Sequence, residues 1–187
     1  MCSSDLYLKD RKYTKIALFH TSGKKFSDSM TAALKANIQG INIVTEFDFK
    51  ASANPKVQIN LAKKAGAQAM VLIPDAYTSQ DPERYRMLSI IRENKGDLPI
   101  IGNEIVKDQT LFNGFNERQL QKLVISLPWH SSSYQNDTIV KPDFWGDRTQ
   151  LDHRIAMTYD ATQVAIEALD RIPLDRKGID EIGRAHV

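Results

Sequence analysis

Short apolar runs and amphipathic stretches alternate along most of the chain. Five runs are rich in apolar and β-branched residues, and we expect each to form a buried strand: 15–19, 41–47, 69–73, 99–102 and 123–127. Between these runs, apolar residues recur at intervals of three and four, which is the spacing of a helix with one buried face. Strands separated by helices favour a parallel sheet with right-handed crossovers. The pattern therefore predicts an α/β fold with a doubly wound parallel sheet.

Capping residues and glycines set the expected limits of the helices. Ser27 or Asp28 can cap the first helix, while Asn54-Pro55 and Asp81-Pro82 each join an N-cap to a proline at the first helical position. Glycines at 40, 66 and 96 follow the amphipathic stretches, as expected at helix ends. The side chains expected on the buried faces of the three helices are Met30, Ala33, Leu34 and Ile38; Val57, Leu61 and Ala65; and Tyr85, Leu88 and Ile91.

The composition changes after Trp129. Residues 7–129 are expected to form the α/β domain, whereas residues 130–147 are polar and turn-rich and read as a linker. Residues 148–181 then return to a helical pattern. Its apolar stripe consists of Met157, Ala161, Val164, Ala165, Ala168 and Leu169. We expect this helix to belong to a different structural unit, and its stripe to lie exposed or to pack only partly, far from the sheet.

The two ends match the translation of a sequencing-library adapter in its two orientations. Residues 1–6 and 182–187 are therefore expected to be foreign to the protein and to make few contacts with its body. The native part is then an internal piece of a longer protein. Cys2, the only cysteine in the chain, and His186 leave the set of candidate functional residues.

Overall composition excludes several classes of function. The chain has 187 residues and a net charge of only +2, and no basic block suggests nucleic-acid binding. No apolar run approaches the eighteen or so residues of a membrane span. We therefore predict no nucleic-acid partner and no membrane insertion in this segment.

In open α/β sheets, ligands bind beyond the carboxyl ends of the strands, so the residues there are the candidates for a site. The loop after the first strand is not a phosphate-binding P-loop, because Leu18 and Lys25 stand where a glycine and a Ser/Thr are required. Asp75 follows the third strand, where a receiver domain has its phospho-acceptor. His20 and Thr21 occupy the place of the receiver's acidic pair, so no metal site results.

Two readings stay open at three of these positions. Asp75 is either a cleft residue or a turn and cap residue. Glu104, after the fourth strand, either faces a ligand ammonium or is a first-turn acid favoured by the helix dipole. Trp129 is either a stacking wall for a ligand or a plug at the edge of the domain.

Motifs of catalysis are missing from the sequence. It contains no Gly-x-Ser-x-Gly elbow, no His-Glu-x-x-His and no Cys-x-x-Cys. His20 is the one histidine at a strand end, and Ser22 is its only neighbouring nucleophile. An α/β enzyme of flavodoxin-like build, using His20 or Asp75, remains the alternative to a binding protein.

An ordered set of segments resembles one lobe of the type I periplasmic-binding fold, in the leucine/isoleucine/valine-binding and receptor-ligand-binding family. The matching segments are Ile16–Phe19 with Ser22-Gly23 and Phe26-Ser27, Ala65–Leu72, Leu98–Gly102, Val124–Trp129 and Ala156–Thr162. Gln68 replaces the family's usual acid in the second segment, and Phe26-Ser27 stands where its amino-acid binders have tyrosine-glycine. The resemblance implies one lobe of a hinged pair, with the last helix belonging to the other lobe.

The resemblance also implies a function. The family binds a small solute between two lobes and performs no reaction, so no cofactor, metal or catalytic residue is expected. Phe26, Tyr77 and Glu104 take the family's ligand-contacting positions. The complete set of expected ligand-binding residues is Ser22, Phe26, Ser27, Asp75, Tyr77, Asn103, Glu104 and Trp129. A membrane permease or a fused signalling domain would be the partner, outside the cytoplasm, and the identity of the ligand stays open.

Overall fold

The computed structural model describes residues 3–51, 53–76, 78, 80–107 and 114–127, together with residues 158, 161, 162, 165 and 166. The chain divides into two units, residues 1–127 and 128–187. Among the described residues, no helix is long and apolar enough to cross a membrane.

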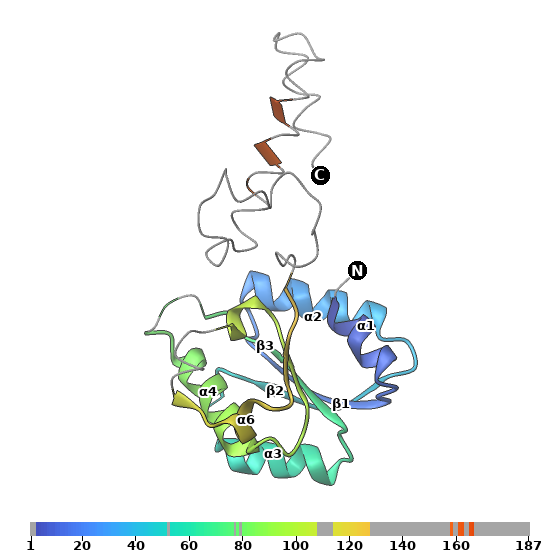
Figure 1. Ribbon diagram of the computed structural model, residues 1–187, viewed down its shortest axis with the longest axis vertical. Coiled ribbons are helices and arrows are strands. Elements are labelled where there is room, and N and C mark those ends of the chain that lie inside the picture. Colours follow the sequence, from blue (N-terminus) through green and yellow to red (C-terminus); the bar gives the residue numbers. More distant parts are fainter. Residues whose placement is uncertain are drawn as a thin grey trace. The chain divides into compact units, whose positions relative to one another are not determined.

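A five-stranded, all-parallel sheet forms the centre of the first unit (Figure 1). Its strands are β1 (Lys15–His20), β2 (Asn42–Asp48), β3 (Ala69–Ile73), β4 (Ile100–Gly102) and β5 (Leu123–Ile125). They lie in the order β2-β1-β3-β4-β5, with every neighbouring pair parallel. The predicted doubly wound α/β fold is confirmed, and the strands fall where the apolar runs placed them.

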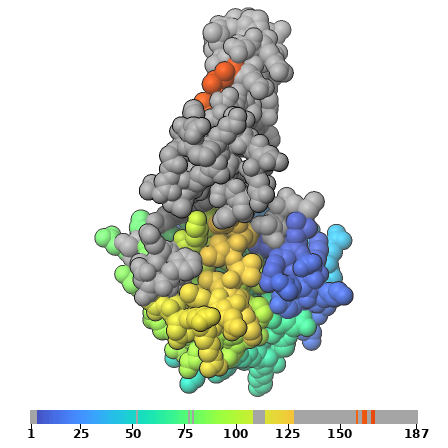
Figure 2. All heavy atoms as spheres, in the orientation of Figure 1, coloured from blue at the N-terminus to red at the C-terminus, as the bar shows by residue number. Residues whose placement is uncertain are grey.

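Helices cover both faces of this sheet (Figure 1). They are α1 (Ser3–Asp10), α2 (Lys25–Asn37), α3 (Pro55–Lys64), α4 (Pro82–Asn94), the 3₁₀ turn η1 (Glu104–Val106) and α6 (Glu117–Leu120). Side chains of α1 and α2 pack with one face of the sheet, and those of α3 and α4 pack with the other. The short β5 and α6 are exposed at the surface (yellow in Figure 2).

The alternation of side chains along each strand divides the core into two layers. In β1, Ile16 and Leu18 join the cluster under α1 and α2, while Ala17 and Phe19 join the cluster under α3 and α4. All five residues of β3 are buried, as expected for a central strand with helices on both faces. Because β3 has no side chain left at the surface, a ligand can reach this strand only at its ends.

The helix-capping predictions are mostly confirmed. Asn54 caps α3, its side chain accepting a hydrogen bond of 2.9 Å from the backbone N–H of Lys56. Asp81 is the N-cap of α4, and Pro82 is its first residue. The prediction for α2 was wrong, since this helix begins at Lys25 with Lys24 as its N-cap. The hydroxyl of Ser27 is used elsewhere, at the ends of the strands.

Some predicted buried faces are also wrong. Val57 and Leu61 are 53% and 49% exposed, Tyr85 is 61% exposed, and Ala33 is exposed. The side chains that point inward instead are Thr31 in α2, Gln58, Ile59 and Ala62 in α3, and Met87 and Ile90 in α4. For α3 the physical reason is its place beside β2, which is the last described strand at this margin of the sheet.

The prediction that residues 1–6 make few contacts is wrong at two positions. Ser4 and Asp5 are buried in α1, 6% and 1% exposed, because Leu8 in the same helix packs into the core. Residues 182–187 lie outside the described residues. In the stripe of the last helix, Ala161 is exposed and Ala165 is half-buried, and its other members lie outside the described residues. The boundaries at 129, 147 and 181 stay predictions.

Two glycines that follow helices, Gly40 and Gly96, give a matched test of how closely α6 packs on the end of α4. Gly40 and Gly96 both have positive φ, of 80° and 76°. A Cβ at Gly40 would meet nothing within 4 Å, whereas one at Gly96 would lie 2.2 Å from the carbonyl oxygen of Arg118. We expect Gly40→Ala to lower the free energy of unfolding by about 1–2 kcal/mol, the cost of the left-handed conformation. Gly96→Ala should lower it by roughly 1–3 kcal/mol more, because backbone must move.

Urea denaturation followed by circular dichroism measures both variants against the wild type. Equal losses in the two variants would contradict the close packing of α6 on the end of α4.

Candidate functional site

The strand order reverses between β1 and β3. The chain leaves β1 toward β2 on one side, and β3 continues on the other side toward β4. Such a reversal of strand order opens a crevice at the carboxyl ends of the strands, where α/β sheets bind ligands. The segments that border it are the loop after β1, the first turn of α2 and the loop after β3.

The hydroxyl of Ser27 ties these three segments together. It donates to the carbonyl oxygen of Ile73 at 2.6 Å and accepts from the N–H of Thr21 at 2.8 Å. Thr21 in turn accepts from the N–H of Asp75 at 3.1 Å through its own hydroxyl. Ser27 and Thr21 are both 0% exposed. The rim of the crevice is therefore held by buried hydrogen bonds, and Ser27 has no exposed surface to offer a ligand.

The carboxylate of Asp75 lies at the start of α2. Its Oδ2 accepts a hydrogen bond of 3.4 Å from the N–H of Ser27 in the first turn of the helix. Asp75 is half-buried. The positive end of the helix dipole stabilises a carboxylate in this place. Asp75 thus places a carboxylate at the strand ends and also joins the loop after β3 to the first turn of α2.

Asp48 forms a second tie, between the ends of β1 and β2. Its carboxylate accepts the hydroxyl of Ser22, the N–H of Ser22 at 3.3 Å and the N–H of Lys50 at 2.8 Å. Partial burial by itself raises the pKa of Asp48, but these hydrogen bonds and the nearby charge of His20 outweigh it, so the pKa lies below its ordinary value. Asp48 is a negative charge held in place by the loop after β1.

His20 takes part in an ion-pair chain and not in a nucleophile pair. Its Nε2 lies 3.0 Å from the carboxylate of Glu46, which also binds Lys35 at 2.8 Å. Its Nδ1 is buried and has no hydrogen-bond partner among the described residues. Ser22, the neighbouring nucleophile in sequence, gives its hydroxyl to Asp48 instead. The hydrogen bonds within the described residues therefore form no His–Ser pair.

Asn103 links the ends of β3 and β4. Its amide nitrogen donates to the carbonyl oxygen of Pro74 at 3.5 Å, and its side-chain oxygen accepts from the N–H of Ile105 at 3.2 Å. Asn103 is 3% exposed. Glu104, the first residue of η1, is half-buried, so part of its side chain remains accessible at the end of β4.

The predicted site residues fall into three groups. Ser22, Ser27, Asp75 and Asn103 all contribute to the hydrogen bonds at the strand ends, while Phe26 and Glu104 are half-buried at the starts of α2 and η1. Tyr77 and Trp129 lie outside the described residues. Within the described part of the chain, no group of three His, Cys, Asp or Glu side chains could hold a metal ion.

Sequence reasoning missed two residues of this rim, Thr21 and Asp48. Asp48 stands at the end of β2, so the rule that ligands meet strand carboxyl ends would have found it had it been applied to the second strand. Thr21 carried a weaker signal, because a hydroxyl that directly follows a buried strand can equally be a turn residue.

No protein-family model matches the chain, and no curated protein matches it. Among solved structures, the chain is similar to a crystal structure from Rhodospirillum rubrum described as a candidate branched-chain amino acid ABC transporter. The TM-score is 0.67 at 14% sequence identity. The similarity covers 96% of this chain and 52% of the other, so the chain spans about half the length of that protein. At this identity the likeness concerns the fold alone, an α/β arrangement with a five-stranded parallel sheet that is consistent with one lobe of a periplasmic-binding fold.

Ser22→Ala tests the tie at Asp48. Because the folded-state pKa of Asp48 is lowered, its stabilisation is fully present above the ordinary value of 3.8 and is lost as the pH falls through the lowered pKa. Without the hydroxyl, we expect a loss of about 1 kcal/mol in the free energy of unfolding at pH 7, with allowance for partial exposure. This loss should shrink below pH 3.8.

The measurement is urea denaturation from pH 7 to pH 2, with Ser29→Ala on the exposed side of α2 as the control. A difference between Ser22→Ala and the wild type that stays constant over this range would contradict the role of Asp48.

Proposed function

We propose that the chain is one lobe of a two-lobed protein that binds a small solute, such as an amino acid, in the crevice beyond β1, β3 and β4. The single observation that carries the proposal is the pre-arranged rim at the reversal of strand order, where Ser27 and Thr21 lock the β1 and β3 loops. A rim that is already ordered loses little conformational entropy when a ligand binds. The similarity to one lobe of a transporter protein supports the same reading.

The roles we propose divide the predicted residues into two kinds. Ser22, Phe26, Asp75 and Glu104 are only partly buried, and we assign them to the ligand. Ser27 and Asn103 are buried and bonded to backbone, and we assign them to positioning. Tyr77 and Trp129 remain proposed ligand contacts on the strength of the resemblance alone.

The excess of acid at the rim favours a ligand that carries an amine. Asp75 and Glu104 both follow central strands, and no described hydrogen bond reaches the carboxylate of Glu104. A branched-chain amino acid, named in the description of the similar structure, has such an amine and is our first candidate. We further propose that a permease or a fused signalling domain is the partner, that the protein acts outside the cytoplasm, and that binding requires no cofactor.

The alternative is an enzyme that uses His20 or Asp75. The strand order is also that of flavodoxin-like proteins, so the fold permits it. The side chains argue against it, because His20 is bonded to Glu46 and Ser22 to Asp48, leaving no activated nucleophile among the described residues. A binding protein will return its solute unchanged after prolonged incubation, whereas an enzyme will not.

The proposed function is tested by titrating the isotope-labelled chain with leucine, isoleucine and valine and following its backbone amides by NMR. We expect weak binding, since one lobe supplies only part of a closed cleft. The shifted amides should be those of residues 21–27, 75–76 and 103–104. No shift with any amino acid, or shifts confined to other surfaces, would contradict the proposal.

Glu104→Ala tests the amine contact. In the two-lobed protein that contains this segment, we expect the variant to bind an amine-bearing solute more weakly by ~1.5–3 kcal/mol, the range for a hydrogen bond to a charged group. Glu117→Ala, an exposed acid on α6, is the matched control and should bind as the wild type does. Unchanged affinity of Glu104→Ala in isothermal titration calorimetry would remove Glu104 from the site.

A further inference from the structure

One margin of the sheet is open. β2 pairs with β1 on one side, and no described strand pairs with its other side. β2 has seven residues, more than twice the length of the three-residue β5 at the opposite margin. A long unpaired edge is a template for another strand, and proteins that stay apart cover or blunt it. The register shift in this pair leaves Val44 as an extra residue near the beginning of β2, whereas residues 45–48 stay in regular register with β1 and contain no proline.

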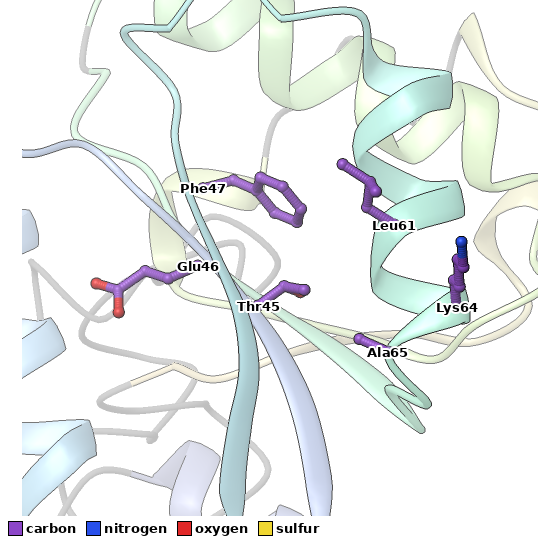
Figure 3. A pocket seen from close by; sticks show the side chains of 6 residues that line it. All are labelled: Thr45, Glu46, Phe47, Leu61, Lys64 and Ala65. Atoms are coloured by element: carbon purple, nitrogen blue, oxygen red, sulfur yellow. The ribbon is translucent and has the colours of Figure 1, made fainter.

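A groove runs between this edge strand and α3 (Figure 3). Its volume is about 480 Å³, and Thr45, Glu46, Phe47, Leu61, Lys64 and Ala65 line it. Phe47 and Leu61 point toward one another across it, while Glu46 points to the other face of the sheet (Figure 3). The hydroxyl of Thr45 is buried without a hydrogen-bond partner among the described residues. The groove is therefore apolar, with one unsatisfied polar group in its wall.

The outer side of α3 continues this apolar surface. Val57, Leu61 and Ala65 are spaced by four residues and so lie along one side of the helix. Val57 and Leu61 are about half exposed, which is unusual for two large apolar side chains on one helical stripe. The stripe and the groove share Leu61 and Ala65. Edge strand, groove and stripe thus form a single surface, which we call the β2–α3 surface.

We propose that the β2–α3 surface binds a second copy of this chain around a twofold axis. Antiparallel pairing of two β2 strands joins the two sheets into one and satisfies the open edge of both. The axis then brings the two α3 helices together on the same face of the joined sheet, so each apolar stripe covers the other. One patch serves both copies, as in an isologous interface.

The charges of the edge suit a second copy. Glu46 is 39% exposed on the outward strand, and two bare glutamates at a twofold axis would repel. Each Glu46 already carries Lys35 at 2.8 Å, so two copies bring neutralised pairs together and permit exchange of the lysines between them. The surface lies on the flank of the sheet, so pairing leaves the crevice at the strand ends unobstructed.

Light scattering coupled to size-exclusion chromatography of the full chain tests the proposal. We expect a dimer at micromolar concentration, and Leu61→Asp should weaken the dimer by more than about tenfold, because the axis buries two uncompensated carboxylates. Tyr85→Asp is the matched control: it adds the same charge in place of an exposed aromatic on α4, and it should leave the dimer intact. Circular dichroism verifies that both variants are folded.

A second measurement locates the contact. Leu61→Cys and Tyr85→Cys, each in a Cys2→Ser background, are treated with a short bismaleimide. Covalent dimers with Leu61→Cys and not with Tyr85→Cys are the expected result. A monomeric wild-type chain, a dimer that survives Leu61→Asp, or equal cross-linking of the two cysteine variants would each overturn the proposal.

Discussion

The hydrogen bonds of one buried serine hold the candidate site together. Ser27 lies in the first turn of α2, yet its hydroxyl bonds to the end of β3 and to the loop after β1. The carbonyl oxygen of Ile73 and the N–H of Thr21 would otherwise be buried polar groups without partners, which is costly in an apolar core. Thr21 extends the same network to Asp75. These bonds therefore hold α2, the end of β3 and the loop after β1 in fixed positions relative to one another.

The carboxylates of Asp48 and Asp75 at this rim are also held by hydrogen bonds from the loops. Asp48 keeps a lowered pKa because the loop after β1 delivers N–H and O–H donors to it, and His20 adds a favourable charge. Asp75 gains from the start of α2. Both carboxylates lie at the ends of the strands, where a cationic group of a solute can meet them. His20 and Lys35 both pair with Glu46 on the α2 face of the sheet, so the charge of this edge residue is compensated within the chain.

Periodicity predicted the sheet well because β3 is apolar along its whole length and β1 is apolar from Ile16 to Phe19, runs too short for a buried helix. It failed on the orientation of α3 and α4. Val57, Leu61 and Tyr85 have the spacing of a buried stripe, but the place of a helix relative to the sheet margin depends on distant pairings that local spacing does not contain. The rule that ligands bind beyond the carboxyl ends of strands predicted Ser22, Asp75 and Asn103 as site residues. It did not reveal that the side chains of Ser27 and Asn103 are bonded to backbone groups, because the partners lie 46 and 29 residues away in sequence, respectively.

Amide hydrogen exchange measures the central claim most directly, namely that the hydroxyl of Ser27 fixes the rim. The N–H groups of Thr21 and Asp75 should exchange slowly in the wild type, only through openings nearly as costly as global unfolding. In Ser27→Ala, both should exchange much faster, while the N–H groups within β4 keep their protection. Fast exchange of Thr21 and Asp75 in the wild type, or equal protection in Ser27→Ala, would contradict the account.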